Sequence, residues 1–312
     1  MRVAIQVGLA LLLAACGGIN VETGTDGGGT AIDSGVPDGS GAPPDAASPG
    51  GDAASDAGPT PSCAWSELSP MPFAVVNGPD DEESATLTGD GRVVFFTAFA
   101  GSGVPEIFDA VRQAADQPFG ASRLVPELNS AAEWELELEV SASGEEIFFA
   151  HLSADPILSA SRASIDDPFG SVAQTGLVGR SPSLSGDGLD LYFADLGLKR
   201  ILRASRSAVG EPWSDPVDVG SLAGYESIDV SSDELHLLMS RSQVFGPPTV
   251  TIATRETVDE PFGAPVSAGE VFDVDQDGAG VKEASWNGDE TQIVVNLDLG
   301  NTGSDMYLST CQ

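Results

Sequence analysis

The most regular feature of the chain is a ten-residue pattern of apolar and polar positions that recurs five times. Each copy starts with an apolar residue and passes through a short polar turn, usually containing Ser, Gly or Asp, into a mostly apolar run. The copies begin at Leu87, Val140, Leu184, Val230 and Trp286. A turn that tolerates positive φ, followed by a β-branched or aromatic run, predicts a β-hairpin in each copy.

These hairpins belong to longer units that repeat every 44 to 56 residues. A loop of variable length leads from each hairpin to a third apolar segment, which ends in Arg in the first four units. The third segments are 107–112, 157–162, 201–206 and 250–255. Seven residues after each Arg comes an aromatic residue preceded by proline, and a short fourth segment follows. Four strands per unit at this period are typical of a β-propeller.

We therefore predict an all-β fold, a five-bladed β-propeller of four-stranded antiparallel blades that occupies residues 63–312. The second strand of a unit, for example 93–96, is apolar on both faces, as expected between two neighbouring blades. The first strand alternates and carries polar residues near its end: Thr86, Glu139, Ser183, Asp229 and Ser285. Such a one-sided strand predicts a wet central channel lined by these side chains.

The Arg that ends the third strand is followed by an acidic residue in each unit, such as Asp116 after Arg112 and Glu211 after Arg206. Because this pairing recurs in every blade, a structural ion pair that fixes the turn is favoured, and a catalytic role for the arginines is not.

The first 16 residues have the pattern of an export signal, with Arg2, an apolar run over 3–14, and Leu-Ala-Ala-Cys ending at Cys16. The run is too short for a permanent membrane helix. The Leu-Ala-Ala-Cys sequence that ends at Cys16 resembles the lipobox of bacterial lipoproteins. This resemblance implies that residues 1–15 are removed and that Cys16 is lipidated. The alternative is an ordinary signal peptide that ends in Cys.

Gly17 follows the cysteine, and by the sorting rule of that family this residue implies that the protein is sent to the outer membrane. The expected location is the bacterial cell envelope, with the periplasmic and the surface side both open.

Residues 16–62 are rich in Gly, Ala, Asp, Pro and Ser and hold almost no large apolar side chain. Such a segment cannot bury enough surface to offset the entropy of ordering, which predicts a flexible tether. Residues 63–312 hold 41 acidic and 12 basic residues, a net charge of −29. A surface this acidic repels phosphates and anionic headgroups, which argues against nucleic acid and leaves the lipid anchor as the membrane contact.

The fifth unit ends after its third strand, where Cys311 stands at the Arg position. The residues 65–67 match 213–215 of the third unit, so the N-terminal segment is expected to complete the last blade and close the ring, removing exposed sheet edges. Cys63 lies just before this segment. Two cysteines beyond the lipid anchor of an exported protein, one on each side of the closure, predict a Cys63–Cys311 disulfide.

The unit Leu-Ser-Gly-Asp-Gly-Leu-Asp-Leu-Tyr-Phe, which starts at Leu184, resembles the TolB-type, WD-like propeller repeat of bacterial envelope proteins. The resemblance covers residues 63–312 and implies a propeller that binds protein or glycan.

A calcium loop is one candidate for a functional site. Asp273, Asp275 and Asp277 alternate and are followed by Gly278, which is how a short loop places oxygen ligands around calcium. The loop departs from the EF-hand because its twelfth position is Ala284, and it resembles the shorter Asp-x-Asp-x-Asp-Gly loops of some propellers. The alternative is an acidic, solvated loop without metal.

Further candidates lie in the loops and strand starts that share one face of the predicted ring: Asp81, Glu83, Glu137, Glu226, Phe99 and Phe245. The acids are expected to converge at the channel mouth. Five-bladed propellers with three central carboxylates occur among glycoside hydrolases, in which an acid and a base flank the glycosidic bond. Phe99 and Phe245 either contact a glycan or peptide or are buried beneath their own loops.

These observations predict a lipid-anchored propeller that is a non-catalytic binding or scaffold module for protein or glycan, with calcium as the candidate cofactor. The acids are many and the units nearly alike, and no nucleophile elbow, phosphate loop or zinc spacing is present. The alternatives are a calcium-dependent glycan-active enzyme of the glycoside hydrolase type and a purely structural surface protein.

Overall fold

The computed structural model describes residues 66, 69–71, 81–99, 103–131, 133–151, 154–221, 224–241, 249–268, 280–288, 290–298 and 303–310. The chain divides into two units, Met1–Ala54 and Ser55–Gln312, and every described residue belongs to the second. Within the described residues, no helix is long and apolar enough to span a membrane.

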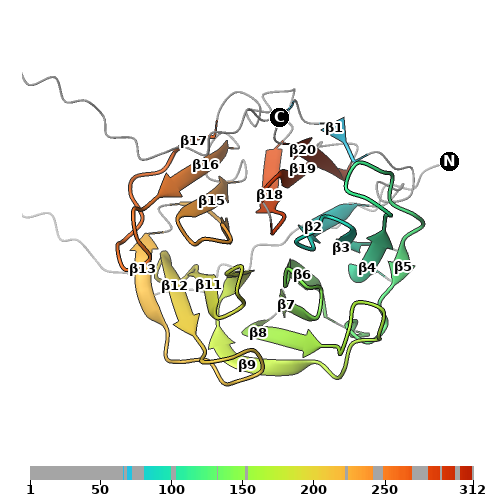
Figure 1. Cartoon of the computed structure of the whole chain (residues 1–312), viewed down its shortest axis with the longest axis horizontal. Coiled ribbons are helices and arrows are strands. Elements are labelled where there is room, and N and C mark those ends of the chain that lie inside the picture. Colours follow the sequence, from blue (N-terminus) through green and yellow to red (C-terminus); the bar gives the residue numbers. More distant parts are fainter. Residues whose placement is uncertain are drawn as a thin grey trace, which may run out of the picture. The chain divides into compact units, whose positions relative to one another are not determined.

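The described strands form five four-stranded antiparallel sheets, arranged as blades around a ring (Figure 1). Blade 1 contains β2 (Glu82–Leu87), β3 (Val93–Ala98), β4 (Glu106–Val111) and β5 (Arg123–Leu124). Blade 2 contains β6 (Glu135–Val140), β7 (Glu146–His151), β8 (Ala154–Ser161) and β9 (Ala173–Val178). Blade 3 contains β10 (Arg180–Leu184), β11 (Asp190–Asp195), β12 (Arg200–Ser205) and β13 (Val217–Ser221).

Blade 4 contains β14 (Ser227–Val230), β15 (His236–Arg241), β16 (Thr249–Thr254) and β17 (Val266–Ser267). Blade 5 contains β18 (Gly280–Trp286), β19 (Gln292–Asp298), β20 (Ser304–Thr310) and β1 (Ser69–Pro70). In each blade the first strand of the predicted repeat is innermost. The prediction of an all-β propeller with five four-stranded blades is confirmed.

Ring closure also follows the prediction. The short strand β1 pairs antiparallel with β20, with Ser69 opposite Leu308 and Pro70 opposite Tyr307. The backbone N–H of Ser66 donates to the Thr310 carbonyl at 2.9 Å, and that of Met71 donates to the Met306 carbonyl at 2.9 Å. The last blade is therefore completed by the N-terminal side of the domain.

The apolar core lies between the blades, because the second strands are buried on both faces. Phe95, Phe149 and Phe193, on the second strands of blades 1 to 3, are fully buried. Phe95 packs in one cluster with Ile147 and Phe149 of the next blade. Each blade thus shares its core with its neighbours, which holds the ring together without continuous backbone pairing between sheets.

The repeated arginines are structural, but none forms the predicted close ion pair with the acid that follows it, although Asp116 and Asp166 attract Arg112 and Arg162 at longer range. Arg206 instead donates to the Gly188 carbonyl at 2.8 Å and makes two hydrogen bonds to Glu146 of the preceding blade. Its guanidinium also stacks over the ring of Trp213 at 4.4 Å. The aromatic residue seven positions on therefore covers the arginine, and a group from the neighbouring blade replaces the local acid as its partner.

Candidate functional site

The inner strands of the ring are distorted at the end where they begin. Register shifts separate Glu83 from Thr86 in β2, Leu136 from Glu139 in β6, and Arg180 from Ser183 in β10. At these bulges Ser84, Glu137 and Ser181 have φ values of 52°, 57° and 51°. Bulges redirect side chains, and left-handed backbone at non-glycine residues is costly, so such positions are common near functional sites.

Beyond the bulges, polar side chains join neighbouring inner strands. The N–H of Val140 donates to Thr86 at 3.3 Å, and that of Leu184 donates to Glu139 at 2.9 Å. The same contact recurs further round the ring, from Val230 N–H to Ser183 at 2.8 Å and from Trp286 N–H to Asp229 at 2.6 Å. Four of the predicted channel residues, Thr86, Glu139, Ser183 and Asp229, therefore connect their blades to the next ones, from blade 1 to blade 5.

A second group of charged residues lies nearer the start of the inner strands, and we call it the channel mouth. It consists of Glu83, Glu137, Arg180, Lys282 and Glu283. Arg180 donates to both carboxylate oxygens of Glu137, at 2.9 and 3.1 Å, and the Ser181 N–H adds a third bond at 2.8 Å. Lys282 pairs with Glu83. Glu283 accepts a hydrogen bond from the Ser84 hydroxyl at 3.3 Å.

Three carboxyl groups at the centre of the ring have unusual pKa values. Burial, with smaller contributions from the Glu137 and Glu83 carboxylates, raises the pKa of Glu283 to about 8. Burial also raises the pKa of Asp229 to about 7, and burial together with the charge of Asp229 raises the pKa of Glu139 well above its usual range. Glu283 is thus protonated at neutral pH, and the Glu137 carboxylate that acts on it accepts hydrogen bonds from Arg180.

Aromatic residues lie at the same face of the ring. Phe99 follows β3 and Trp134 precedes β6, and their rings meet edge to face with centroids 5.4 Å apart. Trp134 is 37% exposed. Nearby, Glu135 is fully buried, and its carboxylate lies 3.6 Å from His151 Nε2. The mouth therefore combines carboxylates with an accessible indole.

The opposite end of the channel is closed by the hairpin turns. Gly89 N–H donates to the Ala142 carbonyl at 3.0 Å, and Gly186 N–H donates to the Ser232 carbonyl at 3.2 Å. The Ser232 hydroxyl donates to the Gly288 carbonyl. A Cβ on Gly288 would lie only 2.8 Å from the Cα of Gly89, so the turns touch there because Gly has no side chain. Two cavities of about 20 and 30 Å³ remain along the channel, each roughly the room of one or two water molecules.

The predicted site residues are partly brought together. Glu83 and Glu137 both act on Glu283. Asp81 is exposed just before β2, where its carboxylate accepts from the Ser304 N–H at 3.3 Å. Glu226 is half-buried just before β14, and its N–H donates to the Ser240 carbonyl at 3.0 Å.

Phe99 is half-buried against Trp134, and its contact with a glycan or peptide stays a prediction. Several predicted residues lie outside the described part of the chain: Cys16, Cys63, Cys311, Phe245, Asp273, Asp275 and Asp277. Among the residues that are described, no group of three or more His, Cys, Asp or Glu is placed to hold a metal. Lipidation, the disulfide and calcium binding therefore stay predictions.

Sequence reasoning missed Glu283, Arg180 and Lys282 as site residues. The signal that points to Glu283 is period-two alternation along the inner strands. The polar positions Glu139 and Ser285 each have a second polar residue two positions earlier, Glu137 and Glu283, although the bulge at Glu137 means that alternation alone does not fix the direction of that side chain.

Comparison with known proteins identifies similar folds but no family. No protein-family model and no curated protein matches the chain. An α-L-arabinofuranosidase from Podospora anserina, solved with cellotriose, is similar with a TM-score of 0.55 and 10% identity over 80% of this chain and 97% of that chain. The catalytic domain of a GH62 α-L-arabinofuranosidase from Coprinopsis cinerea is similar with a TM-score of 0.55 and 9% identity, over 80% of this chain and 97% of that one.

TolB from Acinetobacter baumannii shares 14% identity over 75% of this chain and 55% of that chain, with a TM-score of 0.42. At such identities these likenesses describe the fold. The two arabinofuranosidases correct the prediction that the propeller is non-catalytic, because this fold matches glycoside hydrolases over nearly their whole length. The chain shares its overall fold with those hydrolases.

Proposed function

We propose that the protein is a carbohydrate-active enzyme that hydrolyses glycosidic bonds at the channel mouth. The observation that carries this proposal is the pair of carboxyl groups Glu137 and Glu283, which come from inner strands of two different blades. Glycoside hydrolysis needs one protonated and one ionised carboxyl group on either side of the bond. Burial favours the protonated form of Glu283, whereas Glu137 is held by a guanidinium and a backbone N–H.

Glu283 is the proposed general acid. Its pKa of about 8 leaves it protonated at neutral pH, and Ser84 is the hydroxyl that orients it. Glu137 is the proposed ionised partner, acting on water or on the sugar. Arg180 and the Ser181 N–H fix its position and complement its negative charge.

The aromatic pair gives the proposed site a surface for a sugar ring. Trp134 offers a partly exposed indole beside the start of β6, the strand that carries Glu137. Large aromatic rings with a polar edge suit a ligand that is apolar on one face and hydroxylated at its rim. The Phe99 ring packs edge to face against the indole of Trp134.

The test is turnover of a panel of aryl glycosides, including arabinofuranosides, and of cello-oligosaccharides by the full-length protein. Glu137→Gln and Glu283→Gln are each expected to lower kcat/KM by a factor of about 100 or more. The activity of the unmutated protein is expected to fall above about pH 8 as Glu283 ionises.

Glu145→Gln is the matched control, because Glu145 is exposed in the turn between β6 and β7, at the closed end of the channel. It is expected to leave kcat/KM unchanged. No turnover across the panel, or turnover that survives both channel-mouth substitutions, contradicts the proposal.

We further propose that this enzyme is held in the bacterial envelope through a lipid on Cys16, with residues 16–62 as the tether. The export signal and the Leu-Ala-Ala-Cys sequence support this location. Metabolic labelling with an alkyne fatty acid is expected to tag the unmutated chain, and the Cys16→Ser chain is expected to stay unlabelled.

A further inference from the structure

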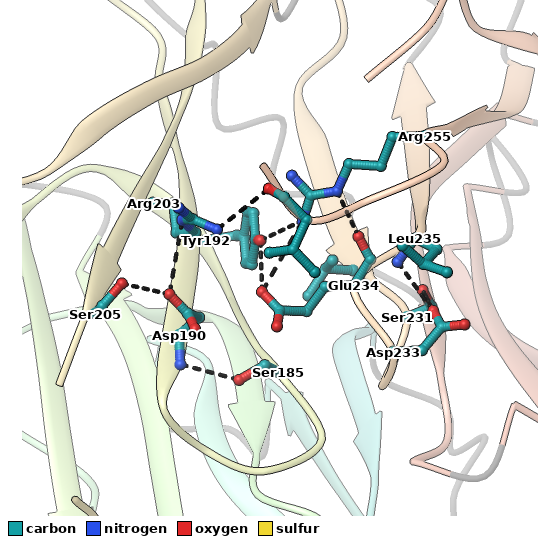
Figure 2. Close-up of polar contacts among 12 residues, drawn as sticks. Ser185, Asp190, Tyr192, Arg203, Ser205, Ser231, Asp233, Glu234, Leu235 and Arg255 are labelled. Atoms are coloured by element: carbon teal, nitrogen blue, oxygen red, sulfur yellow. Dashed lines mark hydrogen bonds and ion pairs between the residues drawn. The ribbon is translucent and has the colours of Figure 1, made fainter. Parts of the chain in front are cut away.

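The repeated arginines mark equivalent positions at successive blade interfaces, and three of the four have a side-chain partner on the preceding blade. Figure 2 shows the interface between blades 3 and 4, where Arg255 Nη2 donates to the Tyr192 hydroxyl at 2.6 Å and Nε donates to the Glu234 carbonyl at 2.7 Å. Arg206 pairs with Glu146 between blades 2 and 3. Arg112 donates to Gln292 at 2.6 Å between blades 5 and 1.

Arg162, at the interface between blades 1 and 2, differs from these. Its Nε donates to the Gly144 carbonyl at 2.7 Å, and its guanidinium stacks on Phe169 at 4.3 Å, as in the other blades. Its Nη2, however, is buried and has no hydrogen-bond partner among the described residues. The reason is in the sequence, because blade 1 has Val93 where Glu146 and Gln292 stand, and Phe95 where Tyr192 stands.

A large groove lies over this interface. It has a volume of about 870 Å³ and opens at the end of the ring opposite the channel mouth, beside the turns that precede β3 and β7. Its apolar lining includes Val111, Leu124 and Ile165, which are 40%, 44% and 37% exposed. The groove therefore combines partly exposed aliphatic side chains with charged ones, and one buried guanidinium nitrogen at its edge has no hydrogen-bond partner.

Several of the acids around the groove already have partners. Asp109 accepts two hydrogen bonds from Arg123, at 2.9 and 2.7 Å. Asp90 accepts from the Thr88 hydroxyl at 2.8 Å and from the Arg92 N–H at 3.0 Å. Asp167 accepts from the Ser164 hydroxyl at 2.7 Å. The carboxylates of Asp109, Asp166 and Glu145 attract the Arg162 guanidinium, but its Nη2 donates a hydrogen bond to none of them.

We propose that this groove binds the C-terminal residues of a partner polypeptide, with the terminal carboxylate on Arg162 and aliphatic side chains on the apolar lining. A guanidinium and a carboxylate match in geometry and charge, and the Glu146–Arg206 pair shows that geometry one blade further on. Aliphatic lining without an exposed aromatic ring suits a peptide better than a sugar.

The position of Ile165 favours a C-terminus over an acidic side chain. Its Cδ1 and Arg162 Nη2 lie 2.1 and 3.4 Å from the point where a Gly144 side chain would begin. A C-terminal residue carries its carboxylate and its side chain on one carbon, so it satisfies the guanidinium and the apolar surface together. Because Nη2 is buried in this structure, the proposed contact requires the partly exposed Ile165 side chain to rotate away from it.

The test measures retention of hexapeptide pools by the full-length protein. The pools have random Ala, Val, Leu or Ile at the last three positions and are made with a free C-terminal carboxylate, with a C-terminal amide, and as amides with an internal Glu. We expect the free-acid pool to be retained at least about tenfold more strongly than either amide pool.

Two substitutions probe the arginine. Val93→Glu supplies the missing internal carboxylate, and Arg162→Gln removes the charge; each is expected to weaken retention at least about tenfold. Arg162→Gln decides the question if Val93→Glu does not fold, which circular dichroism reports. Arg206→Gln at the next interface and Glu137→Gln at the channel mouth are expected to retain the pool as the unmutated protein does.

Failure to retain the free-acid pool overturns the proposal, and so does equal retention by folded Arg162→Gln protein. Stronger retention of the internal-Glu amide pool assigns the groove to acidic side chains and overturns the C-terminal assignment. Because Glu137→Gln is included, a failure at this groove is distinguishable from a failure of the proposed hydrolase.

Discussion

At the scale of single residues, the centre of the ring holds several carboxyl groups whose burial favours the protonated, neutral form. Asp229 accepts hydrogen bonds from Ser183 and from the Trp286 backbone, but burial outweighs these contacts and raises its pKa to about 7. Burial also raises the pKa of Glu139 and that of Glu283. The ring therefore holds protons that an unfolded chain would release.

This proton binding predicts an inverted dependence of stability on pH. Acids whose folded-state pKa exceeds the unfolded value near 4 make the free energy of unfolding fall as pH rises from about 4 to about 8. The melting temperature is expected to decline over that range. Thermal melts by circular dichroism at high salt, which screens the acidic surface, measure it.

Asp229→Asn isolates the central contribution, because the amide keeps the shape and cannot ionise. Its melting temperature is expected to vary less with pH than that of the unmutated protein. A melting temperature of the unmutated protein that rises between about pH 5 and pH 8, or an unchanged slope in the Asp229→Asn protein, disagrees with the assigned pKa directions.

Prediction from sequence at this scale succeeded for Glu139 and Asp229, because alternation along the inner strand places them on the channel side. It missed Glu283 and Arg180 because the bulges and turns at the strand starts, with left-handed residues such as Glu137, are not visible in a simple alternating pattern. It also gave the repeated arginines the wrong partners, since groups on the preceding blade are far away in sequence.

At the scale of elements, the inner strands are joined by side chains and not by a shared backbone ladder. Ser183 illustrates the arrangement, because its hydroxyl donates to Asp229 at 2.7 Å and accepts from the Val230 N–H at 2.8 Å. Both residues it serves are buried. One small hydroxyl therefore connects blade 3 to blade 4 twice.

Ser183→Ala is expected to lower the free energy of unfolding by about 1 to 3 kcal/mol, because it leaves a buried N–H and a buried carboxyl group without this partner. Urea denaturation measures the change. Ser207→Ala, at an exposed position in the turn after β12, is the control and is expected to stay within about 0.5 kcal/mol. A loss as small as that of the control contradicts the role given to Ser183.

The second and third strands were predictable because long apolar runs bounded by turns leave little ambiguity. The fourth strands were not predictable in length: β9 has six residues, whereas β5 and β17 have two. The outermost strand pairs on one side alone, so its length depends on loop contacts and not on a hydrophobic pattern.

At the scale of the whole molecule, stability depends on how the two ends of the ring meet. Ser66 donates its N–H to the Thr310 carbonyl, and its hydroxyl accepts from the Thr310 N–H at 3.0 Å. Ser309 donates to the Ser66 carbonyl at 2.7 Å. Ser66 lies three residues after Cys63, and Thr310 immediately precedes Cys311. This proximity supports the proposed Cys63–Cys311 disulfide.

If the disulfide forms, closing so long a loop adds up to about 5 kcal/mol, so a reductant is expected to lower the melting temperature by several degrees or more. The control is a chain that carries both Cys63→Ser and Cys311→Ser. Its melting temperature is expected to be lower than that of the unmutated chain and not to change when the reductant is added. Equal melting temperatures of the oxidised and reduced unmutated chain count against the bridge.

The closed end of the channel has a consequence for where the proposed enzyme acts on a polymer. Because the turns around Gly89, Gly186 and Gly288 block one end, nothing that enters at the mouth passes through to the other side. A polysaccharide cannot thread through the ring, and the two cavities along the channel hold only one or two water molecules each, so any glycan that the proposed enzyme cleaves stays on the outer surface of the mouth.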